Sequence, residues 1–260
     1  MNHPLNILYE DNQILVCEKP SGIAVQSRRI GTADMESLLK NHIFREGNGQ
    51  RPPYLAVIHR LDQPVRGILV FAKTPFSAKE LNRQLTDGSF GKYYRALVDG
   101  VPPKPEDTLT DYMIKNGRTN LSSICAKDQP GAKQARLTYR TVAPEELFFP
   151  APDVSSHQTE LELQLDTGRH HQIRVQMAHA GAGIYGDMKY NREATEKWNR
   201  ERETPTGSKG LGLFSCGLIF SHPATGKRMK FKVLPGKGPA AIDEWPGLSY
   251  YMNDENEPGR

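Results

Sequence analysis

Segments for membrane insertion or export are missing from this sequence of 260 residues. No apolar run approaches the ~20 residues that a membrane-spanning helix needs. The first residues, Met1-Asn2-His3-Pro4, lack the charged and apolar regions of a signal peptide. We therefore expect a cytoplasmic protein without a membrane partner. Nothing in the sequence indicates an obligate protein partner.

Residues that build disulfides and metal sites are also scarce. The three cysteines, Cys17, Cys125 and Cys216, are far apart and form no C-x-x-C pair. This spacing argues against a disulfide scaffold and against a zinc site, and we expect Cys17 and Cys216 to pack within strands. His170, His171 and His179 match no H-E-x-x-H pattern and have no carboxylate among them. We expect no bound metal.

The charge is small overall but unevenly distributed. The formal net charge is +4. Residues 113–140 carry six cations against Asp128, a net charge of +5, and residues 239–260 carry a net charge of −4. The six cations are Lys115, Arg118, Lys127, Lys133, Arg136 and Arg140. This basic segment is either an ordinary solvated surface or a surface that follows a nucleic-acid backbone.

The hydrophobic pattern predicts strands that follow one another directly, with helices between them at irregular intervals. Such an order is typical of the α+β class, with a mainly antiparallel central sheet flanked by helices. Residues 159–165 alternate most clearly, which predicts leucines on the inner face and polar residues on the outer face. The predicted strands are 5–9, 13–18, 55–58, 68–72, 92–98, 159–165 and 228–233; the predicted helices are 33–45, 74–88 and one beginning near Arg169, and 190–210 is predicted to be a surface insertion, partly helical.

A single carboxylate stands on the predicted connection between two strands. Residues 59–62 read His-Arg-Leu-Asp and lie between the apolar runs 55–58 and 68–72. Reactive groups are commonly held on loops between strands, so Asp62 is the first candidate for chemistry. By itself, an aspartate beside an arginine in a turn is far more often a turn cap or a structural salt bridge.

Further segments narrow this choice. The run Lys92-Tyr93-Tyr94-Arg95-Ala96-Leu97-Val98 alternates as a strand, with Tyr94, Ala96 and Val98 on one face. Residues 167–181 read TGRHHQIRVQMAHAG and are followed by Gly186-Asp187, and residues 220–227 read FSHPATGK. These blocks, in this order and together with residues 8–22, resemble the RluA-type RNA pseudouridine synthases. The resemblance extends from about Ile7 to about Leu234.

The resemblance implies the pseudouridine synthase fold, with a catalytic cleft across the sheet. We expect a catalytic domain at 1–236, with no room before Leu5 for the extra N-terminal RNA-binding domain of many relatives, and an acidic extension at 237–260. Val65-Arg66 departs from the commonest sequence of the family, which indicates a subgroup. Leu213-Phe214-Ser215 departs as well, which leaves the catalytic residues intact but the identity of the substrate open. The implied partner is structured RNA, a stem-loop of ribosomal or transfer RNA.

The resemblance also implies a role for each site residue. Asp62 would act at C1′ of the target uridine, as nucleophile or as base. Arg174 would offset the charge of Asp62, and Tyr94 would lie against the uracil. Arg60 would hold the flipped nucleotide. His59, Lys92 and His171 would complete the substrate-binding residues, with His59 fixing the loop through a hydrogen bond.

A purely structural role is the alternative for three of these residues. Arg174 could be a surface arginine of its helix, Tyr94 a core tyrosine, and Arg60 purely structural. The predicted reaction is an isomerisation of uridine to pseudouridine, which needs no cofactor. Two rival functions remain at this point: an RNA-binding module of the same fold without catalysis, and a hydrolase that uses Asp62 on a nucleoside or glycoside. The hydrolase lacks an obvious second carboxylate.

Overall fold

The computed structural model describes residues 5–27, 31–47, 51–147, 149, 158–201 and 210–233. The predicted acidic extension at 237–260 and part of the predicted insertion at 190–210 lie outside them. In chain order the elements are β1 (Asn6–Glu10), β2 (Ile14–Lys19), α1 (Met35–Glu46), β3 (Ala56–Val57), β4 (Arg66–Ala72), α2 (Pro75–Asp87), β5 (Gly91–Asp99), β6 (Glu106–Asn116), β7 (Leu121–Cys125), β8 (Lys133–Thr141), a 3-10 turn (Pro144–Glu146), β9 (Gln158–Leu165), α3 (Gln172–His179), α4 (Arg192–Glu201), β10 (Leu213–Ser221) and β11 (Arg228–Lys232).

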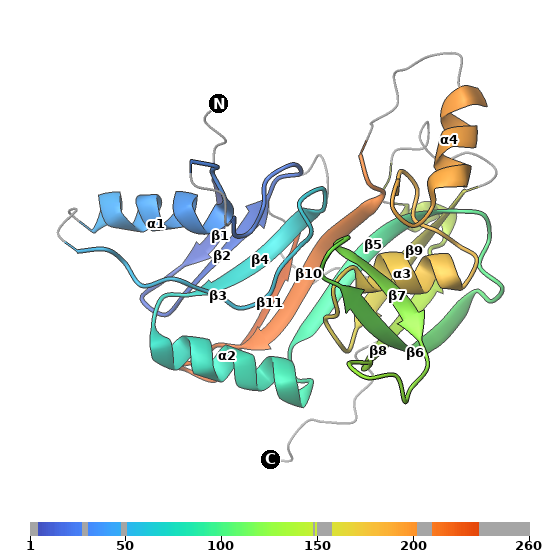
Figure 1. Ribbon diagram of the computed structural model, residues 1–260. Coiled ribbons are helices and arrows are strands. Elements are labelled where there is room, and N and C mark those ends of the chain that lie inside the picture. The colour runs from blue at the N-terminus through green and yellow to red at the C-terminus, as the bar shows by residue number, and fades with distance from the viewer. Residues whose placement is uncertain are drawn as a thin grey trace.

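One mixed sheet organises the described residues (Figure 1). The strands follow the order β1-β2-β4-β10-β5-β9-β8-β6-β7, with β3 beside β4 and β11 beside β10. Among the strand pairs of this described part, β4 and β10 run parallel and the others run antiparallel. The prediction of an α+β fold with a mainly antiparallel sheet is confirmed.

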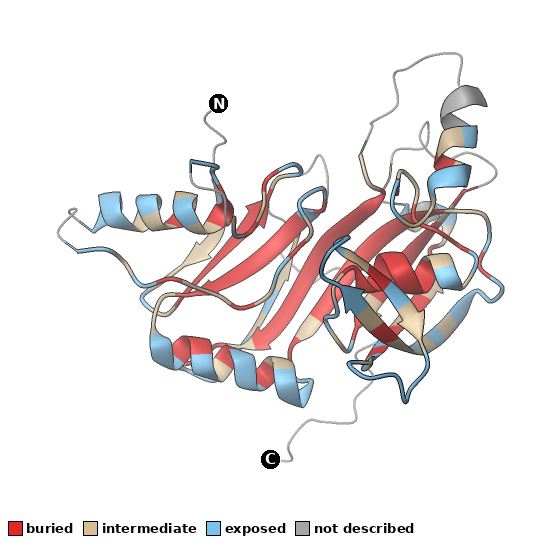
Figure 2. Cartoon of the chain, in the orientation of Figure 1, coloured by how far each residue is buried: buried red, intermediate tan, exposed pale blue. Residues whose placement is uncertain are grey.

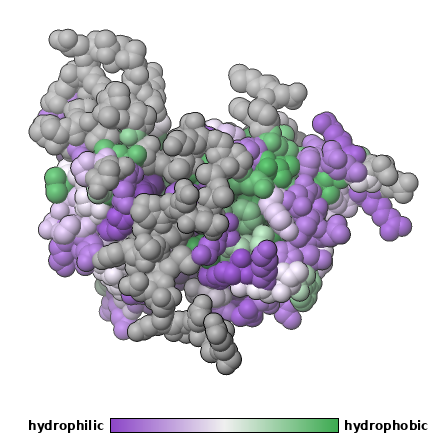
Figure 3. All heavy atoms as spheres, turned by 180° about the vertical axis from the view of Figure 1, so that it is seen from behind, coloured by the Kyte–Doolittle hydropathy of each residue, from purple (hydrophilic) through white to green (hydrophobic). Residues whose placement is uncertain are grey.

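Each face of the sheet carries a hydrophobic cluster. On one face, Met35 and Leu39 of α1 and Ile173 and Met177 of α3 pack with Tyr94. On the other face, α2 packs through Ala78 and Leu81 against β4 and β10. The central strands are therefore buried on both sides (Figure 2). Figure 3 shows the molecule from behind, where hydrophobic residues lie beside strongly hydrophilic ones.

The second helix follows its sequence signals closely. Thr74 accepts a hydrogen bond from the backbone N–H of Ser77 and caps α2, and Pro75 occupies the first turn, where its missing N–H costs nothing. Gly88 ends the helix in a left-handed conformation. The caps at Thr74 and Gly88 confirm the predicted bounds 74–88. Capping and termination depend on neighbouring residues, so these bounds could be predicted from the sequence.

Two expectations about the predicted elements were wrong. The helix expected from Arg169 begins at Gln172, because His171 adopts a left-handed conformation (φ 56°) that a helix cannot include. In β9, Glu160 and Glu162 do not face solvent; they are 2% and 0% exposed. They form ion pairs with Arg95 and Arg140 on the second face of the sheet.

The parallel pairing of β4 with β10 depends on a close approach at Gly67. Gly67 has φ 140°, and a Cβ at this position would stand 2.2 Å from the backbone oxygen of Ser215. No larger residue fits without moving a strand. This contact fixes the end of β4 that follows the Asp62 loop.

Candidate active site

Asp62 lies in the loop between β3 and β4, with its side chain 26% exposed. The backbone oxygen of Asp62 accepts a hydrogen bond from the N–H of Val65 at 3.0 Å, which closes a tight turn. Leu61 and Val65 on either side are buried in the hydrophobic cluster. The loop is thus held by its neighbours while the carboxylate reaches the surface.

Lys19, which the sequence analysis did not select, anchors this loop from below. Its Nζ donates hydrogen bonds to the backbone oxygens of Pro20, Ile23 and Gln63 at 2.9, 2.8 and 3.0 Å. Burial lowers the pKa of Lys19 to about 8, against the opposing charge of Asp62. The signal in the sequence was a lysine at the end of an apolar strand, directly before a Pro-Ser-Gly turn.

Arg174 is brought to Asp62 as predicted. Its Nη1 donates to Oδ2 of Asp62 at 3.0 Å, and its side chain is only 6% exposed, so it is not a surface arginine. Burial alone lowers the pKa of the guanidinium, but hydrogen bonds and charges from Asp187 and Asp62 outweigh burial and raise it. Arg174 therefore stays charged inside the site.

Asp187 is the second partner of Arg174 and was not predicted. Its two carboxylate oxygens accept from Nε and Nη2 of Arg174 at 2.8 and 2.7 Å, and its side chain is 0% exposed. Its Oδ1 also accepts from the N–H groups of Lys189 and Tyr190. Gly186 allows this turn, because it has φ 74° and a Cβ there would stand 2.4 Å from the oxygen of Gly210. The sequence signal was Gly-Asp shortly after the arginine helix.

His171 and Tyr190 complete the inner side of the site. His171 Nε2 lies 3.6 Å from Oδ2 of Asp62, and its Nδ1 lies 2.7 Å from the hydroxyl of Tyr190. Tyr190, another residue that the sequence analysis missed, places its ring 5.2 Å from the guanidinium carbon of Arg174. Burial lowers the pKa of His171 well below its usual range, although Asp62 opposes this shift.

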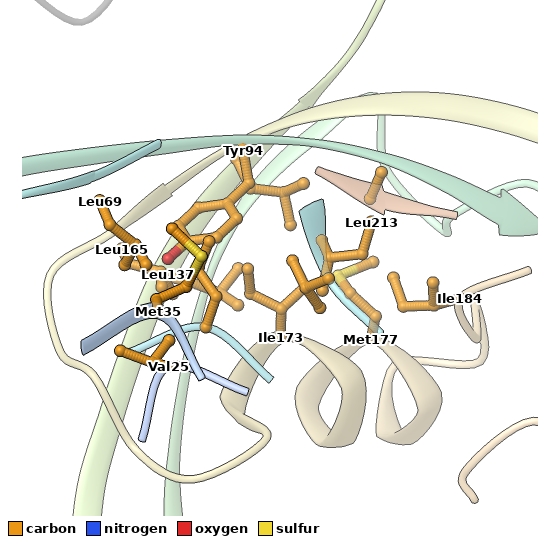
Figure 4. Packing of buried hydrophobic residues seen from close by; sticks show 14 of the residues in the cluster. Val25, Met35, Leu69, Tyr94, Leu137, Leu165, Ile173, Met177, Ile184 and Leu213 are labelled. Atoms are coloured by element: carbon orange, nitrogen blue, oxygen red, sulfur yellow. The ribbon is translucent and has the colours of Figure 1, made fainter. Parts of the chain in front are cut away.

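Tyr94 lies on the same face of the sheet as α3 and is 5% exposed. Figure 4 shows its ring among Leu69, Met35 and Leu165. Burial raises the pKa of its hydroxyl, although the hydrogen bond with Ser215 opposes this shift; the negative charge of Asp62 raises the pKa further. Tyr94 is therefore a core residue whose hydroxyl lies within electrostatic reach of Asp62.

The remaining predicted residues surround the loop. Arg60 is exposed and makes no hydrogen bond or ion pair with any described residue. His59 accepts from the N–H of Val70 at 3.4 Å and packs edge-on against Phe90, as expected of a residue that fixes the loop. Lys92 is 6% exposed, and burial lowers its pKa to about 8. Substrate contact by these residues stays a prediction.

The basic segment 113–140 divides into two parts. Arg136 is exposed but forms an ion pair with Asp166, and Arg140 pairs with Glu146 and Glu162 at the buried face. The other four cations are exposed: Lys115, Arg118, Lys127 and Lys133. Lys115 is close enough to His170 to help lower the pKa of that histidine, after the effect of burial. Of the exposed cations, Lys115 and Arg118 belong to the β6–β7 hairpin, and Lys115 lies near the site.

No group of three or more His, Cys, Asp or Glu side chains within the described ranges is arranged to hold a metal ion. Cys17 and Cys216 are buried in β2 and β10, as predicted, and Cys125 is partly buried. Over the same ranges, no helix is long and apolar enough to cross a bilayer.

Comparison with known proteins connects this geometry to a family. Residues 13–179 match the family model described as RNA pseudouridylate synthase, and this match includes Asp62, Tyr94 and Arg174. The chain belongs to the RNA pseudouridylate synthase family. The resemblance to RluA-type synthases is confirmed, since the relatives found carry the names of ribosomal large subunit pseudouridine synthases.

Several curated relatives of this family align over most of the chain. Ribosomal large subunit pseudouridine synthase C of Buchnera aphidicola is 31% identical over 241 residues, 89% of this chain and 69% of the relative. Its namesake in Escherichia coli K12 is 31% identical over 239 residues, 89% of this chain and 67% of the relative. Synthase D of Zymomonas mobilis is 28% identical over 88% of this chain and 68% of the relative. The chain thus spans about two thirds of the length of these relatives.

Solved structures support the fold assignment. Human RNA Pseudouridylate Synthase Domain Containing 4 has a TM-score of 0.66 at 20% identity, covering 89% of both chains. Human RNA Pseudouridylate Synthase Domain Containing 1 has a TM-score of 0.64 at 17% identity, covering 95% of this chain and 94% of that one. At these identities the likeness concerns the fold alone, and the predicted pseudouridine synthase fold is confirmed.

Proposed function

We propose that this protein isomerises uridine to pseudouridine in RNA, with Asp62 as the essential carboxylate. The observation that carries the proposal is a partly exposed aspartate whose Oδ2 is bound by the buried, charged Arg174. The guanidinium gives the carboxylate of Asp62 a charged hydrogen-bond partner inside the protein. Asp62 can therefore present its carboxylate at the surface, where a nucleotide can reach it.

The reaction matches a site of this kind. The N1–C1′ bond of uridine breaks, the uracil turns, and a C5–C1′ bond forms; the C5 proton is then removed while N1 gains a proton. Atoms and electrons balance within the nucleotide, so the reaction requires no cofactor. Asp62 would act at C1′ as nucleophile or base, and Tyr94 and Arg174 complete the proposed catalytic residues.

The proposed substrate is a uridine in structured RNA. The named relatives act on the large ribosomal subunit by their names, which favours ribosomal RNA over transfer RNA. A paired uridine must leave its helix to reach Asp62, and we propose that the exposed Arg60 holds the flipped arrangement. Lys92 and His59 are the further substrate-site residues, whereas His171, expected from the sequence to bind substrate, lies against Asp62. The exposed cations Lys115 and Arg118 of the β6–β7 hairpin would contact phosphates.

The decisive test is Asp62→Asn, which nearly keeps the shape of the side chain but removes its charge. We expect loss of tritium release from C5-labelled uridine in RNA by many orders of magnitude, with filter binding nearly unchanged, because binding rests on phosphate contacts elsewhere. Asp128→Asn, an exposed aspartate in the turn before β8, makes the same change in net charge and is the matched control. Turnover near wild type in Asp62→Asn would refute the mechanism.

The same assays distinguish the two rival functions. A wild-type protein that binds RNA without forming pseudouridine would be a silent RNA-binding module. Release of free uracil from RNA would identify a hydrolase. Pseudouridine mapping of total RNA with and without the gene would then identify the modified position, since a site that disappears identifies the substrate.

A further inference from the structure

Two side chains approach the same oxygen of the Asp62 carboxylate. Arg174 Nη1 lies 3.0 Å from Oδ2, and His171 Nε2 lies 3.6 Å from the same atom. Among the residues that the structure describes, none donates a hydrogen bond to Oδ1. Arg174 therefore holds one carboxylate oxygen, while the other has no donor among the described residues and the side chain is 26% exposed.

The hydrogen bonds of Tyr190 determine which nitrogen of His171 carries the proton. The Tyr190 hydroxyl accepts from the backbone N–H of Ser122 at 2.9 Å. In the described part of the chain, Nδ1 of His171, at 2.7 Å, is the acceptor available for the Tyr190 proton. A neutral imidazole has one donor and one acceptor nitrogen. Nδ1 therefore accepts, and Nε2 carries the hydrogen that points toward Asp62.

The opposite tautomer of His171, with the proton on Nδ1, would be unfavourable at both ring nitrogens. It would place the lone pair of His171 Nε2 against a carboxylate oxygen, and it would leave the Tyr190 proton without a described acceptor. Burial, together with the cations Arg174 and Lys189, keeps the pKa of His171 low, so the ring is neutral at neutral pH.

Stacking with the His170 ring restricts the plane of the His171 ring. The His170 ring stacks on it with centroids 3.7 Å apart and an interplanar angle of 26°. His170 Nδ1 is itself hydrogen-bonded to Oγ of Ser122 at 2.9 Å. Ser122 in β7 thus contacts both supporting side chains, His170 and Tyr190, and links the hairpin to the position of the ring.

Given the function proposed above, we propose that His171 is a positioning residue whose Nε2–H attracts Oδ2 of Asp62 electrostatically across 3.6 Å, and that Tyr190 sets its tautomer. Together with Arg174, His171 leaves Oδ1 as the oxygen that acts at C1′ of the uridine. His171 serves the reaction through Asp62 and does not contact the nucleotide.

Two substitutions at His171 separate the effect of its side-chain Nε2–H from any effect of its left-handed backbone conformation. Gln places a side-chain N–H near the position of Nε2, whereas Asn reaches only as far as Nδ1. The left-handed backbone (φ 56°) favours Asn over Gln, so His171→Asn should melt no lower than His171→Gln. We expect the single-turnover rate to follow the opposite order, with Gln close to wild type and Asn slower by about tenfold to a hundredfold.

Tyr190→Phe provides a second, independent variant. It keeps the ring beside Arg174 but cannot donate to His171, and we expect a loss of about tenfold in the single-turnover rate. The dissociation constant for RNA, measured by filter binding, should stay the same in all three variants. An Asn variant as fast as the Gln variant, or a Tyr190→Phe variant with the wild-type rate, would overturn the proposal.

The tautomer can be measured without any activity. Nitrogen-15 NMR of histidine-labelled wild-type protein should show His171 neutral with the proton on Nε2, and Tyr190→Phe should shift it toward a mixture. A proton on Nδ1 in the wild type would overturn the positioning role even if the enzyme is active. The expected tautomer in a protein that forms no pseudouridine would instead refute the proposed function and leave the positioning of Asp62 intact.

Discussion

The buried charge of Arg174 depends mainly on Asp187, so Asp187→Asn should destabilise the protein strongly. Asp187 accepts two hydrogen bonds from Arg174, at 2.8 and 2.7 Å, and two from backbone N–H groups. The substitution keeps the shape but turns one acceptor oxygen into an amide donor, which then faces the guanidinium or a backbone N–H. Among the described residues, Asp62 would remain as the single carboxylate partner, on the more exposed side of the guanidinium.

The expected magnitude follows from the removal of this partner. Removing one partner of a buried ion pair costs about 3–5 kcal/mol. For a domain of this size each kcal/mol lowers the melting temperature by about 2–4 °C, so a decrease of about 10 °C is expected. Urea and thermal unfolding would measure it. The exposed control Asp128→Asn should change the free energy of unfolding by less than about 0.5 kcal/mol.

Activity should fall as well, even when the variant is folded. The guanidinium of Arg174 would be free to shift toward the introduced amide or away from it, so the held oxygen of Asp62 would no longer have a fixed position. The single-turnover assay should be run well below both melting temperatures so that the folded fraction does not limit the rate. A decrease in stability below about 1 kcal/mol together with a wild-type rate would refute the role of Asp187.

Three further predictions concern the surface, the core and the pH dependence. Lys115→Ala in β6 with Lys133→Ala in β8 should reduce the slope of log affinity against log salt by about 0.7–0.9 for each phosphate that is no longer neutralised. An unchanged slope in the folded variant would remove these two lysines from the RNA site. Tyr94→Phe should keep stability and RNA binding but react more slowly, whereas Tyr94→Ala should also lower the free energy of unfolding by about 3–5 kcal/mol; wild-type single-turnover rates in both would exclude Tyr94 from the chemistry. Burial and then the charge of Lys92 lower the pKa of His59 from 6.5 to about 3. The unfolded chain therefore takes up a proton first as the pH falls, and stability should decrease below pH 6.5 by up to about 1.4 kcal/mol per pH unit. Urea unfolding between pH 7 and pH 5 should show a smaller decrease for His59→Gln, and an equal decrease would contradict this origin.

The sequence was sufficient for features that depend on local chemistry. The caps of α2 at Thr74 and Gly88 are set by neighbouring backbone groups, so they could be read directly. The two faces of β5 followed from alternation, since Tyr94 and Tyr93 fall in separate clusters. The family motifs identified Asp62 and Arg174, which the fold brings within 3.0 Å across 112 positions of sequence.

The expected outward placement of Glu160 and Glu162 shows where local patterns fail. Alternation states which residues share a face, but it does not state whether the second face is covered. β9 lies between β5 and β8, and cations from both neighbours, Arg95 and Arg140, meet its carboxylates there. Burial of these glutamates therefore depends on strands that are distant in sequence.

The sequence by itself thus determined seven of the strands, the capped helix and the candidate carboxylate Asp62, because these depend on periodicity, on turn chemistry and on motif; β6, β7 and β8 were not predicted. Only the tertiary structure decided how that carboxylate is held. Lys19 secures its loop, Asp187 balances Arg174, and Tyr190 orients His171. These contacts join β2, the β3–β4 loop, α3 and the turn at 187–190, and a buried charge is satisfied by whichever group the fold brings nearest in space, not by its neighbours in the chain.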